Sequence, residues 1–136
     1  GEKEERDAPE IVGGHERILF VDDEAMLTDL TGRMLQSLGY RVTTRTSSVE
    51  ALELFRSRHG DFDLVITDMT MPNMTGAALA REMLAIRPDL PVILCTGYSE
   101  FMTAEHAREL GIRGYIMKPM NRRDLAKAVR DALDGV

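Results

Sequence analysis

The 136-residue sequence contains a single cysteine, Cys95, so it cannot form an internal disulfide. It has no apolar run approaching the roughly 18 residues that a membrane-spanning helix needs. It also lacks an excess of positive charge, because 17 Lys and Arg residues stand against 23 Asp and Glu residues. An acidic balance argues against general affinity for nucleic acid or anionic membranes. We therefore expect a cytoplasmic segment that neither inserts into a membrane nor binds nucleic acid directly.

The first sixteen residues differ from the rest of the chain. They mix charged residues with Pro9 and the pair Gly13-Gly14, and they show no apolar period. Such a composition is typical of a tail or linker. We therefore predict an acidic tail or linker at 1–16 and one domain at 17–134, which is long enough for a single core.

From residue 18 onward, short apolar runs alternate with helical patterns. Leu27, Leu30, Met34 and Leu38 have the spacing of an amphipathic helix that Gly39 ends. Ser47 begins a capping box for the next helix, which Gly60 ends. The predicted strands lie at 18–21, 40–45, 64–66, 92–95 and 114–117, and the predicted helices at about 27–38, 48–59, 75–86, 99–111 and 121–133.

Five strands that alternate with five helices through short connections predict an α/β fold. The strands should form one parallel sheet with helices on both faces. The crossovers between successive strands should be right-handed. Alternation alone leaves the order of the strands open.

Polar or charged residues follow four of the five predicted strands. These residues are Asp22 and Asp23, Asp68, Thr96 and Lys118. The carboxyl ends of parallel strands lie on one edge of the sheet, where ligands bind in such folds. We therefore expect three carboxylates, one hydroxyl and one amine to lie close together.

Three ionised carboxylates at one edge repel each other. Two unit charges about 4 Å apart repel by roughly 4 kcal/mol at an effective dielectric of 20. Either some of the carboxyl groups are protonated or a cation lies among them. Oxygen ligands suit Mg²⁺, which commonly bridges to a phosphate. With Lys118 nearby, the group fits an aspartate that accepts a phosphoryl group.

The chain resembles the receiver domains of two-component response regulators over residues 17–134. The resemblance rests on VDDE at 21–24, TDMTMPNMTG at 67–76, LCTGYS at 94–99 and GYIMKP at 114–119. Each motif is weak alone, but their order and spacing together are specific. The resemblance implies a single-domain (βα)5 flavodoxin-like sandwich with strand order 2-1-3-4-5.

The resemblance also implies roles for the acidic residues. Asp68 would be the phosphoacceptor and would contact Mg²⁺. Asp23 would be a direct carboxylate ligand of the Mg²⁺, and Asp22 would help through a water molecule. The backbone carbonyl of Thr70 would be a further metal ligand.

Three other residues receive roles from the same resemblance. Thr96 and Lys118 would bind the phosphoryl oxygens, and the bond between Lys118 and Pro119 would be cis. Thr96 and Tyr115 would form a switch, in which the tyrosine turns inward as the threonine approaches the phosphate. The surface that changes would include the helix at 99–111, the strand at 114–117 and the helix after 121.

Each of these residues also has a simpler interpretation. Asp22 and Asp23 would then be first-turn acids that favour a helix dipole. Thr96 would be an ordinary turn residue, Lys118 a solvated charge and Tyr115 part of the core.

Three functions remain open from the sequence. The leading one is a phosphoacceptor that takes phosphoryl from a histidine kinase or a histidine phosphotransfer domain. The second is a small Mg²⁺-dependent phosphohydrolase that works through an aspartyl-phosphate, although Met69 and Thr70 offer no second acid-base group. The third is a partner-binding module that is never phosphorylated. Any catalysis in the leading case is limited to self-phosphorylation and autodephosphorylation.

The context of the domain stays open as well. The ILCTGYS segment at 93–99 and the linker-like tail resemble receivers at the C-terminus of hybrid sensor histidine kinases. A free-standing receiver and a homodimer are alternatives. The sequence identifies neither the cognate kinase nor the output.

Overall fold

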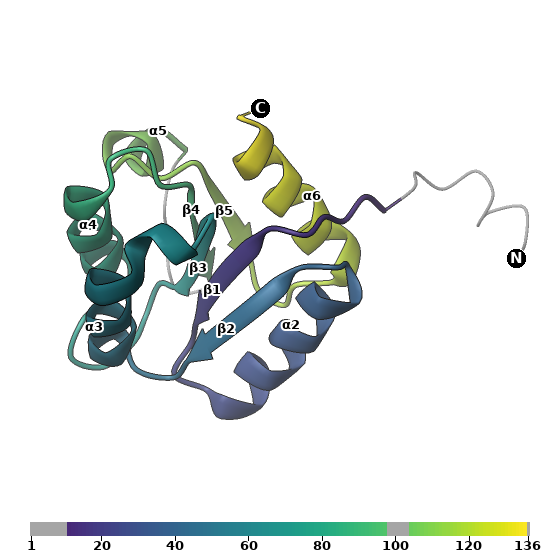
Figure 1. Ribbon diagram of the computed structural model, residues 1–136, viewed down its shortest axis with the longest axis horizontal. Helices are drawn as coiled ribbons and strands as arrows, with labels where there is room; N and C mark the ends of the chain where they lie inside the picture. Colours follow the sequence, from purple (N-terminus) through teal and green to yellow (C-terminus); the bar gives the residue numbers. More distant parts are fainter. Residues whose placement is uncertain (1–10, 98–103, 136) are drawn as a thin grey trace, which may run out of the picture.

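The computed structural model describes residues 11–97 and 104–135, which form one α/β sandwich (Figure 1). Its strands are β1 (Arg17–Val21), β2 (Arg41–Arg45), β3 (Leu64–Asp68), β4 (Val92–Thr96) and β5 (Gly114–Met117). Its helices are α2 (Ala25–Ser37), α3 (Ser48–Arg58), α4 (Gly76–Ile86), α5 (Ala104–Glu109) and α6 (Arg122–Asp134), with a 3-10 turn, η1, at His59–Asp61.

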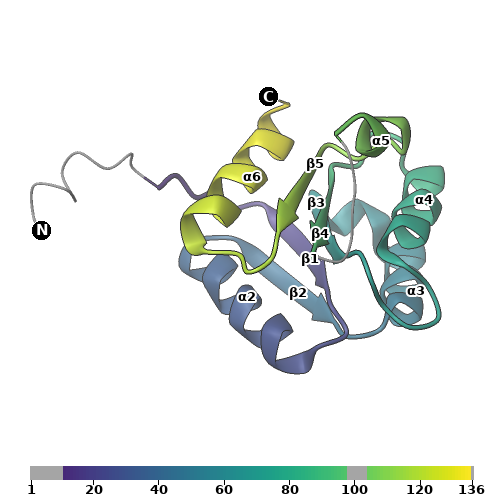
Figure 2. The ribbon, with the colours of Figure 1, turned by 180° about the vertical axis from the view of Figure 1, so that it is seen from behind.

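The five strands are parallel and lie in the order β2-β1-β3-β4-β5. Helices α2 and α6 cover one face of the sheet, and α3, α4 and α5 cover the other, as the two opposite views show (Figures 1 and 2). The predicted fold class and strand order are therefore confirmed.

The apolar strands are buried because helices cover both faces of the sheet. In β1, Leu19 and Val21 belong to the core beneath α3 and α4, whereas Ile18 and Phe20 belong to the core beneath α2 and α6. All four side chains are fully buried. Burying one side chain of this kind contributes about 1.5–3 kcal/mol. Because its side chains alternate between the two faces of the sheet, β1 stabilises both cores.

Side-chain caps begin three of the helices. Ser47, Thr75 and Asn121 each accept a hydrogen bond from the backbone N–H three residues later. The predicted cap at Ser47 is thus confirmed for the bond that its hydroxyl accepts from Glu50, while Thr75 lies one residue before its helix. The predicted helix start near Ser99 lies outside the described residues.

The face of α2 that turns toward the sheet differs from the stripe that its leucines indicate. The buried residues of α2 are Thr28, Thr31, Gly32 and Leu35, whereas the side chain of Leu30 is 52% exposed. Thr28 can be buried because its hydroxyl donates to the backbone oxygens of Asp22 and Glu24, each at 2.8 Å. Leu30 consequently faces outward, although Leu38 beyond the helix end is buried.

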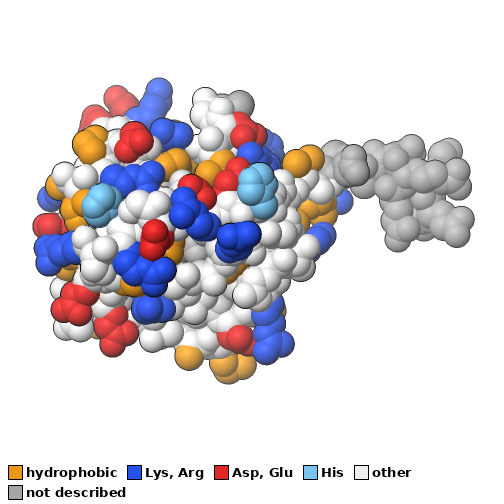
Figure 3. Space-filling view, viewed as in Figure 1, with side chains coloured by type: hydrophobic (Ala, Val, Ile, Leu, Met, Phe, Trp, Pro, Cys, Tyr) orange, Lys and Arg blue, Asp and Glu red, His pale blue; other side chains and the backbone are white. Residues whose placement is uncertain are grey.

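Charges of both signs are interspersed on the face shown in Figure 3. Arg17 pairs with Asp63 at 3.1 Å, and Arg58 pairs with Asp61 at 2.7 Å. Among residues 11–97 and 104–135, no helix is both long and apolar enough to cross a membrane.

Candidate functional site

Three aspartates lie together at the carboxyl edge of the sheet. Asp22 and Asp23 directly follow β1, and Asp68 is the last residue of the adjacent strand β3. One carboxylate oxygen from each lies within 4.8 Å of the others. Asp22 and Asp68 are buried, whereas Asp23 is exposed. The site therefore has a buried floor and one carboxylate open to solvent.

Lys118 lies between the two buried carboxylates. Its Nζ is 3.0 Å from Oδ2 of Asp22 and 2.8 Å from Oδ1 of Asp68. Burial alone would lower the pKa of Lys118, but hydrogen bonds and charges from Asp68 and Asp22 outweigh it, so the pKa is raised. The amine therefore stays protonated at neutral pH, and the solvated-charge interpretation of Lys118 is wrong.

The backbone near the end of β5 fixes the position of Lys118. The amide of Lys118 donates to the carbonyl oxygen of Thr96 at 2.7 Å, which extends the pairing of β5 with β4. The Lys118-Pro119 bond is cis, as predicted. Thr96 itself is buried at the end of β4. Lys118 thus reaches the acidic residues from the end of β5, and Thr96 ends the strand that lies between β5 and β3.

Asp22 has two structural partners. Its Oδ1 accepts a hydrogen bond from the backbone amide of Glu24 at 2.9 Å, while its Oδ2 faces Lys118. Glu24 is the N-cap residue of α2. The helix-start interpretation of Asp22 therefore holds in part, but the same carboxylate also belongs to the charged cluster.

A glycine holds the loop after β3 close to Asp68. The amide of Gly76 donates to the carbonyl oxygen of Met69 at 2.8 Å. A Cβ atom at position 76 would overlap the backbone oxygen of Asp68, so only glycine allows this approach. Thr70 is exposed at the rim of this loop. The sequence interpretation assigned Gly76 no role, although a glycine at the first position of a helix was a usable signal.

The donor set fits a hard divalent cation. Three carboxylates and one ammonium leave two negative charges in excess when all four groups are ionised. Oxygen ligands beside an exposed carboxylate suit Mg²⁺, which usually keeps several of its waters. Asp22, Asp23 and Asp68 are the residues that would hold the ion. The role of the Thr70 backbone carbonyl as a further ligand stays a prediction.

Tyr115 lies on the edge strand β5 and is 42% exposed. The interpretation of Tyr115 as packed core is therefore wrong for this structure. The side chain is separated in sequence from Lys118 by two residues, Ile116 and Met117, of which Ile116 is buried. Any inward turn of Tyr115 would start from an exposed position.

The chain is thus a parallel (βα)5 sandwich with three aspartates and a lysine at the carboxyl edge of its sheet. The response regulator receiver domain model matches residues 18–130. The chain therefore belongs to the response regulator receiver domain family, as its motifs predicted.

Individual relatives agree with this assignment. The chain is 35% identical over 123 residues to the sensor kinase CckA of Brucella abortus, covering 90% of this chain and 13% of the relative. It is 36% identical to the transcriptional regulatory protein ZraR of Escherichia coli O157:H7, covering 85% of this chain and 26% of that protein. The chain thus spans a small part of these curated relatives.

A solved receiver domain protein from Clostridium thermocellum has a similar structure. Its TM-score is 0.83 at 34% sequence identity, with 88% of this chain and 95% of that chain covered. The fold and the family are therefore supported by both sequence and structure.

Proposed function

We propose that this domain accepts a phosphoryl group on Asp68 from a phosphohistidine donor in a two-component phosphorelay. The observation that carries the proposal is the position of Lys118, whose ammonium contacts both Asp22 and Asp68 beside the solvent-open Asp23. A buried carboxylate with an adjacent fixed cation can act as a nucleophile while charge on the incoming oxygens is neutralised.

In the proposed reaction, a carboxylate oxygen of Asp68 attacks the phosphorus atom. The new O–P bond forms as the P–N bond to the donor histidine breaks, and the imidazole leaves with the electron pair and takes a proton. Lys118 donates hydrogen bonds to the phosphoryl oxygens, and the Thr96 hydroxyl binds another of them. A bound Mg²⁺ would neutralise charge on the same oxygens. The chemistry depends on positioning and electrostatics.

Intact mass spectrometry tests the proposal directly. The protein is incubated with Mg²⁺ and a small phosphodonor such as acetyl phosphate, and we expect a single added phosphoryl group. A wild-type chain that gains no such mass would overturn the proposal, provided that circular dichroism shows it folded. Omission of Mg²⁺ is the internal control.

We propose that phosphorylation changes the surface formed by α5, β5 and α6. A phosphoryl group adds about −1.5 to −2 charges beside Thr96, which is buried at the end of β4. Movement of Thr96 toward this group would free space toward β5. Tyr115 is the side chain that would turn inward to occupy it.

Metal binding gives a prediction that does not depend on phosphorylation. We expect Mg²⁺ to raise the melting temperature of the wild-type chain, because it binds the folded carboxylate cluster and not the unfolded chain. Asp23→Asn should melt higher than wild type without Mg²⁺, because it removes one repelling charge, and should gain much less from Mg²⁺. Differential scanning fluorimetry measures both effects.

Asp29→Asn is the matched control for this prediction, because Asp29 is exposed on α2 and pairs with Arg33. Its response to Mg²⁺ should equal that of wild type. If Asp23→Asn and wild type respond equally, the proposed role of Asp23 as a ligand is wrong.

The donor would dock beside the site on the exposed face of α2. A groove of about 380 Å³ lies there, lined mainly by apolar side chains of α2 and by the loop after β5. Leu30 and Met34 form its α2 side, and Pro119 and Met120 form the other. Lys118 also lines the groove, so a partner seated in it would lie next to Asp68.

Leu30→Asp tests this surface. We expect transfer from a purified histidine phosphotransfer domain that labels wild type to fall about tenfold, because central apolar contacts dominate interface energies. Labelling by acetyl phosphate should not change, since the substitution leaves Asp68 intact. Phosphotransfer is followed with radiolabelled phosphate. Val49→Asp, at an exposed position on α3, is the control, and equal rates for both variants would contradict the docking proposal.

We also propose that the domain works within the cytoplasm as part of a longer histidine kinase chain. The support is its similarity to CckA, a sensor kinase of which it covers 13%. Immunoblotting of the native source with an antibody against the domain would test this context. We expect the antibody to detect a polypeptide much longer than 136 residues.

A further inference from the structure

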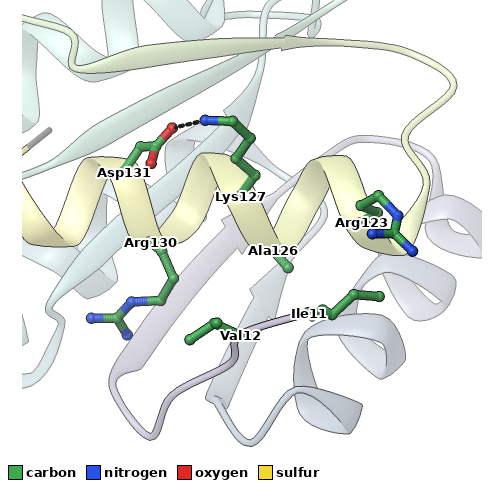
Figure 4. A pocket seen from close by; sticks show the side chains of 7 residues that line it. All are labelled: Ile11, Val12, Arg123, Ala126, Lys127, Arg130 and Asp131. Carbon is green, nitrogen blue, oxygen red and sulfur yellow. Dashed lines mark hydrogen bonds and ion pairs between the residues drawn. The ribbon is translucent and has the colours of Figure 1, made fainter. Parts of the chain in front are cut away.

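A second groove lies on α6, away from the carboxyl edge of the sheet. It has a volume of about 350 Å³ and lies between residues 11–12 and the helix (Figure 4). Ile11, Val12 and Ala126 provide apolar surface, and Arg123 and Lys127 provide positive charge. The groove shares none of its lining residues with the phosphoacceptor site.

The chain is fixed at the downstream end of this groove. Glu16 receives hydrogen bonds from Nη1 of Arg130 on both carboxylate oxygens, each at 2.9 Å. The amide of Gly14 donates to the carbonyl oxygen of Leu38 at 3.0 Å. A Cβ atom at Gly14 would overlap Tyr40 and the ion pair itself, so the chain passes close to α6 at this point.

The path of the chain leads upstream along the helix. In Figure 4, Val12 lies on the Arg130 side of the groove and Ile11 on the Arg123 side. Ile11 also packs partly against the core beneath α6. Ile11 therefore lies toward the amino-terminal half of α6, which begins with Arg122 and Arg123.

Residues 1–10 complement this half of α6 in charge and length. They contain five acidic side chains, Glu2, Glu4, Glu5, Asp7 and Glu10, against two basic ones, Lys3 and Arg6. Ten extended residues span up to roughly 33 Å. The 13 residues of α6 span only about 20 Å. The segment is thus long enough to reach every basic residue on the helix.

The basic residues of α6 differ in their exposure and in their position relative to the groove. Arg130 is engaged by Glu16 and Asp134. Lys127 pairs with Asp131 at 2.7 Å but remains 77% exposed, and an ammonium has three donors. Arg123 borders the groove at the end toward which the chain runs. Arg123 and Lys127 are consequently the contacts that an acidic segment would use.

We propose that residues 1–10 dock on α6 of the same chain, with their carboxylates beside Arg123 and Lys127 and their apolar atoms in the groove. The contact ties residues 1–10 to the helix that begins four residues after Lys118. It does not rest on the proposed phosphorylation of Asp68.

Paramagnetic relaxation in the full chain tests the proposal. A nitroxide is attached to Lys3→Cys; the native Cys95 is fully buried and does not compete for the label. We expect broadening of the backbone amides of residues 123–127, independent of protein concentration. Arg123→Glu combined with Lys127→Glu should reduce this broadening about fivefold, as should 0.5 M salt, because exposed ion pairs are weak and screened.

Arg56→Glu combined with Arg81→Glu, at exposed positions on α3 and α4, is the matched control and should leave the broadening unchanged. Three results would each overturn the proposal. The first is that the amides of α6 are not broadened. The second is that the strongest broadening lies at Leu30 and Met34 on α2. The third is that the broadening grows with protein concentration, which would show that it arises between copies.

Discussion

Asp68→Asn is expected to abolish the phosphoryl mass gain, lowering the rate of labelling by at least about a thousandfold. A neutral amide is a poor nucleophile, and removing the nucleophile from such a site eliminates most of its catalysis. The substitution keeps the shape of the side chain, which is buried at the end of β3. Loss of labelling would therefore result from the missing nucleophile and not from a packing defect in the core.

Stability distinguishes this result from misfolding. Asp68→Asn reduces the excess negative charge of the cluster from two to one, so the metal-free variant should unfold at the same or higher urea concentration than wild type. Asp89→Asn, at a side chain that is 83% exposed, is the control and should label normally. If Asp68→Asn still gains one phosphoryl group, the acceptor is another residue.

Lys118→Met should have the second largest effect. It removes the only ammonium that the described residues place between Asp22 and Asp68, and leaves two buried carboxylates without it. Removing one partner of a buried ion pair costs about 3–5 kcal/mol. Because Lys118 is 22% exposed, we expect a loss near the lower end, about 3 kcal/mol in the free energy of unfolding.

The measurement is urea unfolding with and without Mg²⁺, together with phosphoryl labelling. Mg²⁺ should restore part of the lost stability, since it supplies positive charge to the same carboxylates, but labelling should stay at least about a hundredfold below wild type. Lys127→Met is the matched control on α6 and should change stability by less than about 0.5 kcal/mol. Adding Asp68→Asn to Lys118→Met should restore part of the lost free energy of unfolding, because Asp22 is then the one buried carboxylate of the cluster. A double variant no more stable than Lys118→Met would show that the lysine does not act through these charges.

The fold could be predicted because its signals are local. The buried runs such as Ile18 to Val21 are continuous where both faces of the sheet are covered, and Ser47 and Asn121 cap helices through their own side chains. The meeting of Asp68 with Lys118 also followed from topology, since all parallel strands end at one edge. The strand order came from resemblance, because alternation of strands and helices is compatible with several orders.

Other features depend on tertiary contacts, which the spacing of apolar residues in the sequence does not predict. The leucines of α2 suggest an apolar face, yet the helix turns Thr28 and Gly32 toward the sheet. That orientation requires the hydrogen bond from Thr28 to the backbone of Asp22, a partner that the helical period does not reveal. The pairing of Glu16 with Arg130 spans 114 positions, so residues interpreted only as a linker are in fact attached to α6.

The Asp22 carboxylate takes part in two interactions, and this affects how the acidic site is held in place. One carboxylate orders the first amide of the turn into α2 and at the same time balances the ammonium of Lys118. The entry to α2 and the position of the amine therefore cannot be adjusted independently. A charge change at Asp68 that draws Lys118 away would alter the partner of Asp22, and thus the turn from which the exposed leucine face of α2 begins. Under the proposed function, Asp22 would therefore connect the charge state of Asp68 with the surface of α2, although Asp22 takes no part in the bond that forms.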